Sequence, residues 1–248
     1  MKNLAGKYCI VTGAGQGIGK AIAKKFLEEE AAGVAILEYN FELAQATAKE
    51  LDPTGERCIA IKCNVADDAM VKAAVEETMA KFGRIDCLVN NAGITRDKIF
   101  HKMTDDDWYA VINVNLNGTY LLCKYVVPIM REQESGSIVN MSSTSLMGNP
   151  GQANYAATKA ALQGFTRTMA KELGRKNVRM NCIAPAYIDT EMMRSIPKEQ
   201  FESIPKRVPM QRLAEPSEIA SITAFLCTEE ASWVSGQTIF ASGAAICM

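Results

Sequence analysis

Tyr155 and Lys159 stand four residues apart in the run Tyr155-Ala-Ala-Thr-Lys159. On a helix, this spacing places both side chains on one face. A phenol can exchange a proton with a substrate oxygen, and we expect the neighbouring ammonium to lower its pKa from about 10. Ser142 ends an apolar run typical of a strand and offers a hydroxyl for the same oxygen. These residues predict a proton-transfer site without histidine, in a chain with one histidine in 248 residues.

A glycine-rich turn near the start of the chain predicts a dinucleotide-binding loop. It follows an apolar strand-like run at 8–11 and precedes a helical pattern at 18–29. Glycines permit a tight turn and close approach of a pyrophosphate, and the helix start offers unpaired N–H groups to the anion. The residues expected to contact the cofactor in this turn are Gly13, Gln16, Gly17, Ile18 and Gly19.

Together with later motifs, these residues resemble the short-chain dehydrogenase/reductase family. The motifs are the glycines at 13, 17 and 19, the run Asn90-Asn-Ala-Gly93, Asn115, Ser142 and the Tyr155/Lys159 pair, and the resemblance extends from residue 7 to about 243. Within the family, the stretches 93–97 and 148–155 are most similar to bacterial 3-oxoacyl-[acyl-carrier-protein] reductases and acetoacetyl-CoA reductases.

The resemblance implies a role for each catalytic candidate. Tyr155 would be the general acid/base, and Lys159 would also hold the nicotinamide ribose. Ser142 would orient the substrate oxygen, and Asn115 would kink its helix and relay protons through water to the lysine. Ser143 is expected to point to the other face of the strand, and the spacing to Tyr155 favours Ser142.

The resemblance also implies cofactor contacts beyond the glycine turn. Small residues after the apolar run at 85–90 would let the backbone pass behind the cofactor. The residues after the run at 57–63 would contact adenine, and the residues after the run at 177–184 would contact nicotinamide. These candidates are Asn91, Ala92 and Gly93, then Asn64 and Val65, and then Pro185, Ile188 and Thr190, with Tyr155 and Lys159 at the ribose. A helix cap is the alternative reading of Asn64.

Glu38 indicates which dinucleotide is used. It ends the second apolar run, where a carboxylate can accept hydrogen bonds from both adenosine ribose hydroxyls and repel a 2′-phosphate. Many NADP users of the family carry a basic residue nearby, whereas this chain has Gln16, Tyr39 and Asn40. NAD(H) is therefore favoured, with NADP(H) as the alternative.

The elements that must position these residues alternate along the chain. Strand-like runs occur at 7–12, 33–38, 57–63, 85–90, 136–142, 177–184 and 237–241, and helical patterns fill the gaps near 17–30, 41–51, 67–82, 105–131, 152–174 and 215–228. The alternation predicts an α/β fold: a single-domain, Rossmann-type, doubly wound parallel sheet of about seven strands with helices on both faces, spanning 1–248. The proline-containing stretch at about 187–212 is expected to be a substrate lid with a short helix or two.

Composition argues against a nucleic-acid partner, a membrane span and a metal site. The net charge is −1 without a basic stripe, which argues against a nucleic-acid partner, and no apolar run approaches a membrane span of about 20 residues. The eight cysteines form no Cys-x-x-Cys pair, and Cys9, Cys63, Cys87 and Cys182 lie in apolar runs, as expected for small buried hydrophobic residues in a reducing cytoplasm. With His101 standing alone, no metal is expected.

The substrate and assembly are less sharply defined. The resemblance favours a 3-oxoacyl thioester and its 3-hydroxyacyl form, with another secondary alcohol (a steroid, polyol or cyclic alcohol) as the alternative and a non-catalytic regulator as a minor one. A basic carrier-docking surface is half matched, because 131–135 is partly acidic and 175–176 is basic, so acyl carrier protein and CoA both stay open. Apolar residues on more than one face of 105–131 and 152–174, and the apolar end 244–248, predict a homotetramer.

Overall fold

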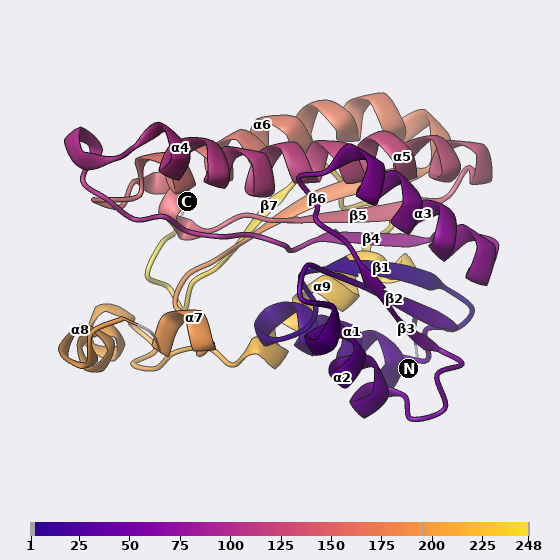
Figure 1. Cartoon of the computed structure of the whole chain (residues 1–248), viewed down its shortest axis with the longest axis horizontal. Coiled ribbons are helices and arrows are strands. Elements are labelled where there is room, and N and C mark those ends of the chain that lie inside the picture. Colours follow the sequence, from indigo (N-terminus) through magenta and orange to yellow (C-terminus); the bar gives the residue numbers. More distant parts are fainter. Residues whose placement is uncertain (1–2, 195, 248) are drawn as a thin grey trace.

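A seven-stranded parallel sheet forms the centre of the computed structural model, which describes residues 3–194 and 196–247 (Figure 1). The spatial order is β3-β2-β1-β4-β5-β6-β7. The strands are β1 (Tyr8–Thr12), β2 (Gly33–Glu38), β3 (Cys58–Lys62), β4 (Cys87–Asn90), β5 (Gly136–Met141), β6 (Val178–Pro185) and β7 (Thr238–Ala241). The predicted fold class is confirmed, and each strand lies within a residue or two of its predicted run.

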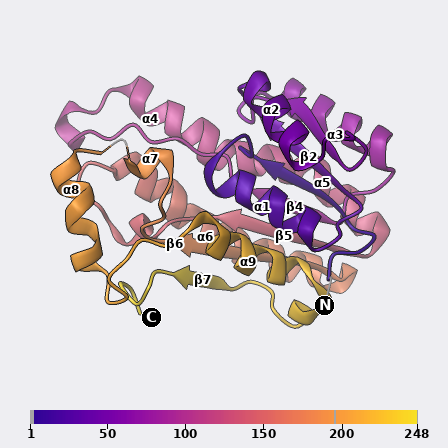
Figure 2. The ribbon, with the colours of Figure 1, turned by 90° about the horizontal axis from the view of Figure 1, so that it is seen from below.

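Helices cover both faces of the sheet (Figures 1 and 2). On one face lie α1 (Gly17–Glu28), α2 (Phe41–Leu51) and α9 (Pro216–Cys227). On the other lie α3 (Asp68–Phe82), α4 (Asp105–Ile112), α5 (Gly118–Gln133) and α6 (Ala153–Leu173). Two separate buried clusters result, one on each face, because strands covered on both sides direct alternate side chains into different layers.

The order of the strands creates the crevice in which a ligand can bind. The chain moves outward from β1 to β3, then crosses back to place β4 on the other side of β1. Loops leaving β1 and β4 therefore diverge at the carboxyl edge of the sheet, the usual ligand site in such folds. The segment after β6 contains the short helices α7 (Glu191–Arg194) and α8 (Lys198–Ser203), which lie together at one end of the molecule (Figure 2).

The helical stretch predicted at 105–131 is continuous but irregular. Between α4 and α5 the chain forms a π-helical turn, Asn113–Asn117. A π turn inserts an extra residue into the helical ladder and is frequent at functional sites. Here it contains Asn115, which is only 1% exposed.

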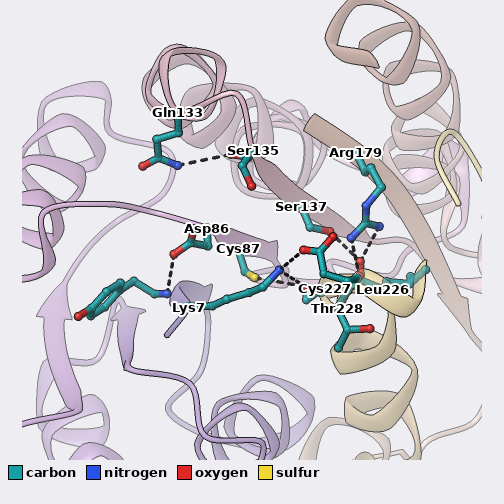
Figure 3. Close-up of polar contacts among 12 residues, drawn as sticks. Lys7, Asp86, Cys87, Gln133, Ser135, Ser137, Arg179, Leu226, Cys227 and Thr228 are labelled. Carbon is teal, nitrogen blue, oxygen red and sulfur yellow. Dashed lines mark hydrogen bonds and ion pairs between the residues drawn. The ribbon is translucent and has the colours of Figure 1, made fainter. Parts of the chain in front are cut away.

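At the opposite edge of the sheet, where the strands begin, polar contacts hold helix α9 in place (Figure 3). Arg179 on β6 is buried and donates to the carbonyls of Leu226 and Thr228 at 2.8 and 3.0 Å. These carbonyls end helix α9, where a cation is favoured by the helix dipole. Lys7 donates to Glu229 at 2.8 Å beside them. The edge away from the crevice thus ties α9 to the sheet.

The cysteines expected to be buried hydrophobic residues are buried. Cys9, Cys63, Cys87 and Cys182 have at most 1% exposure, and all eight thiols are free. Burial raises the pKa of Cys63 to about 12, so this thiol stays protonated and unreactive. Within 3–194 and 196–247, no three His, Cys, Asp or Glu side chains are arranged to hold a metal ion, and every helix is too short or too polar to span a bilayer.

Candidate active site

The glycine turn between β1 and α1 is shaped for close approach. Gly13 and Gly17 have φ angles of +62° and +57°, which side-chain-bearing residues rarely adopt. A Cβ atom on Gly19 would lie 2.3 Å from the Gly13 carbonyl oxygen, and one on Gly13 would lie 2.9 Å from the Cα of Ala92. The turn therefore needs glycine both for its backbone angles and for its contact with the segment after β4.

Asn91 locks this turn rather than presenting its amide to a ligand. Its Nδ2 donates to the carbonyls of Thr12 and Gly13 at 2.9 and 3.0 Å. In return, the Thr12 hydroxyl accepts the backbone N–H groups of Asn91 and Ala92 at 3.0 and 2.9 Å. The loops that leave β1 and β4 are thereby held together, and their backbones form the floor of the crevice.

The start of α1 suits an anion. Its first turn has no acidic residue, and the side chain of Gln16, at the N-cap, makes no capping hydrogen bond within the described structure. Unpaired N–H groups and the positive end of the helix dipole therefore face the crevice, as a pyrophosphate requires. Half-buried Ile18 packs against the core behind them. Together with the space that the glycines keep open, this arrangement fits a dinucleotide.

Glu38 ends β2 beside the same turn. One carboxylate oxygen accepts from the N–H of Gly15 at 3.2 Å, and the other accepts from Tyr39 and Asn40 at 2.9 and 3.3 Å. These bonds fix a negative charge next to the glycine turn. The side chain of Tyr39 is 71% exposed.

Asn64 and Val65, the candidates for contact with adenine, follow strand β3. Asn64 is half-buried and its Oδ1 accepts from Ala66 at 3.1 Å, while Asp67 caps α3, so the helix-cap reading of Asn64 is wrong. Val65 is buried against Gly118 at the start of α5.

After β6, the chain turns back towards the glycine turn. Pro185 ends β6, and Ile188 is buried and pairs with Ala214. The methyl carbon of Thr190 lies 3.7 Å from where a Cβ of Gly17 would stand. Gly17 and Thr190, 173 positions apart in the sequence, therefore lie close together.

Tyr155 and Lys159 lie in the first two turns of α6, and the Lys159 ammonium is 5.4 Å from the Tyr155 ring centroid. Lys159 is 4% exposed and donates to the carbonyl of Met141 at 2.6 Å. Burial lowers its pKa to about 8. The two residues share one face, as the spacing of four predicts.

The expected direction of the Tyr155 pKa is wrong in this structure. Burial raises the pKa, a hydrogen bond with Ser143 lowers it, and the charge of Asp97 raises it, with a net upward shift. The phenol is therefore held in its protonated form.

The contacts of the two serines favour Ser143 over Ser142 as the partner of Tyr155. The Ser142 hydroxyl is 3% exposed and donates to the backbone carbonyl of Lys159 at 2.7 Å. Ser143, half-buried, is the serine that hydrogen-bonds Tyr155. Strand β5 ends at Met141, and Ser143 begins a short 3₁₀ turn in which its hydroxyl also accepts from Ser145 at 3.2 Å. Strand alternation separates the two serines, but chain spacing does not decide which of them faces the helix.

Asn115 is brought next to this cluster by its π turn. Its side chain bonds both backbone groups of Ile94, with N···O distances of 2.9 and 3.0 Å. A Cβ on Gly93 would lie 3.4 Å from Asn115 Oδ1 and 3.6 Å from Lys159 Nζ. Asn115, Gly93 and Lys159 are therefore neighbours, and the loop after β4 runs between the helix and the lysine.

Two residues beside Tyr155 were missed from the sequence. Asn154 is fully buried, and its amide donates to the carbonyls of Arg96 and Asp107 at 3.1 and 3.0 Å. Gln152 donates to the Asp97 carboxylate at 2.8 Å. Neither residue belongs to a recognisable catalytic pattern, and only the fold brings 96–98 against the start of α6.

Comparisons with known proteins agree with this arrangement. A family model described as enoyl-(acyl carrier protein) reductase matches residues 13–243. The 3-oxoacyl-[acyl-carrier-protein] reductase of Thermotoga maritima is 44% identical over 241 residues, covering 97% of this chain and 98% of that protein. Proteins of the same name from Chlamydia trachomatis and Staphylococcus aureus are 42% and 40% identical, each over at least 96% of both chains. With its glycine turn, parallel sheet and paired Tyr155 and Lys159, the chain belongs to the short-chain dehydrogenase/reductase family.

Proposed function

We propose that the protein is an NAD(P)(H)-dependent oxidoreductase that interconverts a 3-oxoacyl thioester and its 3-hydroxyacyl form. The observation that carries the proposal is the cluster of Tyr155, Lys159 and a serine hydroxyl at the carboxyl edge of the sheet, beside the anion-binding glycine turn. Its named relatives, 3-oxoacyl-[acyl-carrier-protein] reductases of nearly equal length, support the substrate class.

The bound nicotinamide would supply the hydride in reduction and accept it in oxidation. In reduction, Tyr155 gives its proton to the substrate oxygen, and the raised pKa keeps that proton in place until then. Ser143, in the role first expected of Ser142, donates a hydrogen bond to the same oxygen. Lys159, cationic below a pKa of about 8, stabilises the phenolate that remains and holds the nicotinamide ribose. Asn115 positions the loop at Gly93 and passes a proton to Lys159 through water.

For the cofactor, we propose NAD(H) in preference to NADP(H). Support comes from the Glu38 carboxylate, which its three backbone N–H partners hold beside the glycine turn. A 2′-phosphate at this place would meet a negative charge, whereas a 2′-hydroxyl could donate to it. The other proposed contacts are Asn64 and Val65 at the adenine, and Pro185, Ile188 and Thr190 at the nicotinamide.

For the acyl carrier, the named relatives support acyl carrier protein, whereas the half-matched basic surface leaves CoA as the alternative. The basic end of α6 is partly neutralised, because Lys176 donates to Glu134 at 2.7 Å. The other half of the expected docking surface, 131–135, includes two glutamates. An acidic carrier protein would find fewer unpaired cations here than a basic surface offers.

The assembly we propose is a homotetramer, as the family resemblance implies. Each subunit is a single domain, and its stretch 187–212 closes over the substrate as a lid. Support comes from aromatic side chains that one subunit leaves uncovered, since Tyr120 is 53% and Trp233 99% exposed. Of the apolar end 244–248, Met248 lies outside the described residues. The eight free thiols, seven of them buried, suit a reducing cytoplasm, where we propose the protein works.

A substrate panel tests the function. Purified protein is assayed with NADH and NADPH on acetoacetyl-CoA, acetoacetyl-acyl-carrier-protein, a steroid ketone and a keto-sugar. We expect the highest kcat/KM on an acetoacetyl thioester with NADH. Activity confined to a steroid or a sugar would contradict the thioester proposal. A monomeric mass by light scattering at micromolar concentration, with activity intact, would contradict the tetramer.

A further inference from the structure

Gly15, in the middle of the glycine turn, is held through both of its backbone polar groups. Its N–H donates to the Glu38 carboxylate at 3.2 Å, and its carbonyl accepts from the Thr47 hydroxyl at 2.7 Å. No second hydrogen bond to the Gly15 carbonyl is found among the described residues. Glu38 ends β2 and Thr47 lies in α2, so two consecutive elements hold one residue of the turn from outside.

The Thr47 hydroxyl does not bond within its own helix. A threonine in a helix can donate to the carbonyl four residues earlier, and Thr78, Thr119 and Thr223 do so at 2.8, 3.2 and 2.8 Å. Thr47 instead reaches a carbonyl 32 positions away in the sequence. Its side chain is buried, with 2% exposure, so its hydroxyl is committed to the glycine turn.

Helix α2 leaves the turn little room at Gly15. A Cβ atom on Gly15 would lie 2.9 Å from Leu43 Cγ and 3.2 Å from Glu38 Cγ, so this position requires glycine. Glycine restricts the backbone least of all residues, and two further glycines stand at 13 and 17. Contacts from outside the turn must therefore fix its conformation.

The direction of the Gly15 carbonyl also sets the direction of the next N–H group. In a planar trans peptide, the C=O and N–H bonds point in opposite directions. Because the Gly15 carbonyl points to α2, the N–H of Gln16 points away from α2, and it has no protein acceptor among the described residues. Gln16 is the N-cap of α1, where unpaired N–H groups suit an anion.

We propose that Thr47 is a positioning residue for the cofactor: by holding the Gly15 carbonyl against α2, it fixes the glycine turn in the form that accepts the pyrophosphate. This inference rests on the proposed function, in which the turn binds a nicotinamide dinucleotide. Gly15 is buried, so without the Thr47 hydroxyl its carbonyl loses its donor, which favours other orientations of the peptide. A turn that is less often in the binding form binds the cofactor more weakly.

Thr47→Val tests the proposal, because valine has nearly the same shape and lacks the hydroxyl. Thr47→Ser restores a hydroxyl, and Thr78→Val is the matched control, because it removes an equally buried helical hydroxyl from α3. The Kd of NADH is measured by fluorescence titration, well below the Tm of each protein. We expect a Kd about fivefold higher in Thr47→Val, and at most about twofold higher in Thr47→Ser and Thr78→Val.

The effect should lie in cofactor binding rather than in proton transfer. In the reduction of an acetoacetyl thioester, the KM for NADH should rise with the Kd, whereas kcat at saturating NADH should change by a smaller factor. A Kd in Thr47→Val equal to that in Thr78→Val would overturn the proposal. A Kd that stays as high in Thr47→Ser as in Thr47→Val would also overturn it.

A second readout needs no cofactor. Hydrogen exchange of the backbone N–H groups at 13–17 should be faster in Thr47→Val than in the wild type and in Thr78→Val. Equal exchange in all three proteins would refute the positioning role. If exchange differs as expected but none of the proteins binds NADH or NADPH, the proposed function is wrong, while the role of Thr47 in fixing the turn stands.

Discussion

The two adjacent serines, Ser142 and Ser143, should differ sharply when each is changed to Ala. Ser143→Ala removes the hydroxyl that hydrogen-bonds Tyr155 and that we place on the substrate oxygen. Loss of one such donor typically lowers kcat by about 10²–10³. The lost hydrogen bond to the Ser145 N–H adds only about 1 kcal/mol of destabilisation.

Ser142→Ala removes a buried 2.7 Å bond to the Lys159 carbonyl. That carbonyl stays within helix α6, where the helical ladder still provides a donor. The cost is therefore about 1 kcal/mol, or a Tm lower by roughly 2–4 °C, with kcat within about tenfold of the wild type.

The assay is reduction of acetoacetyl-CoA by NADH, with Tm measured on the same samples. Ser143→Thr is the control, because it keeps a hydroxyl and should recover much of the activity lost in Ser143→Ala. The reasoning would be refuted if Ser142→Ala lost about 100-fold in kcat at an unchanged Tm while Ser143→Ala stayed within a few-fold of the wild type.

Three further outcomes are expected. Tyr155→Phe keeps the ring but removes the proton donor, so kcat should fall at least ~100-fold in a folded enzyme, and near-normal turnover would exclude Tyr155 as the acid. Glu38→Ser combined with Tyr39→Arg should move the kcat/KM preference towards NADPH, which a wild type that already prefers NADPH would contradict. Gly19→Ala places a Cβ 2.3 Å from the Gly13 carbonyl, so NADH binding, measured by fluorescence titration, should weaken at least about tenfold. Gly164→Ala, whose Cβ would meet nothing within 4 Å, should bind NADH as tightly as the wild type does.

Local patterns in the sequence were sufficient to predict the fold and the glycine turn. Apolar runs separated by helical periodicity predicted all seven strands, because strands covered on both faces need continuous apolar residues. The glycines at 13, 17 and 19 predicted a turn whose backbone angles and close contacts exclude larger residues. The spacing of Tyr155 and Lys159 predicted their shared face, since both lie on one helix.

Only the tertiary structure decided which side chains meet across elements. Ser142 and Ser143 differ by one position, and which of them faces Tyr155 depends on where β5 ends and how α6 packs beside it. The raised pKa of Tyr155 reflects burial and the charge of Asp97, a residue 58 positions away in sequence. Desolvation and charge act through distances in the folded chain, and sequence spacing determines such distances only within a single helix or strand.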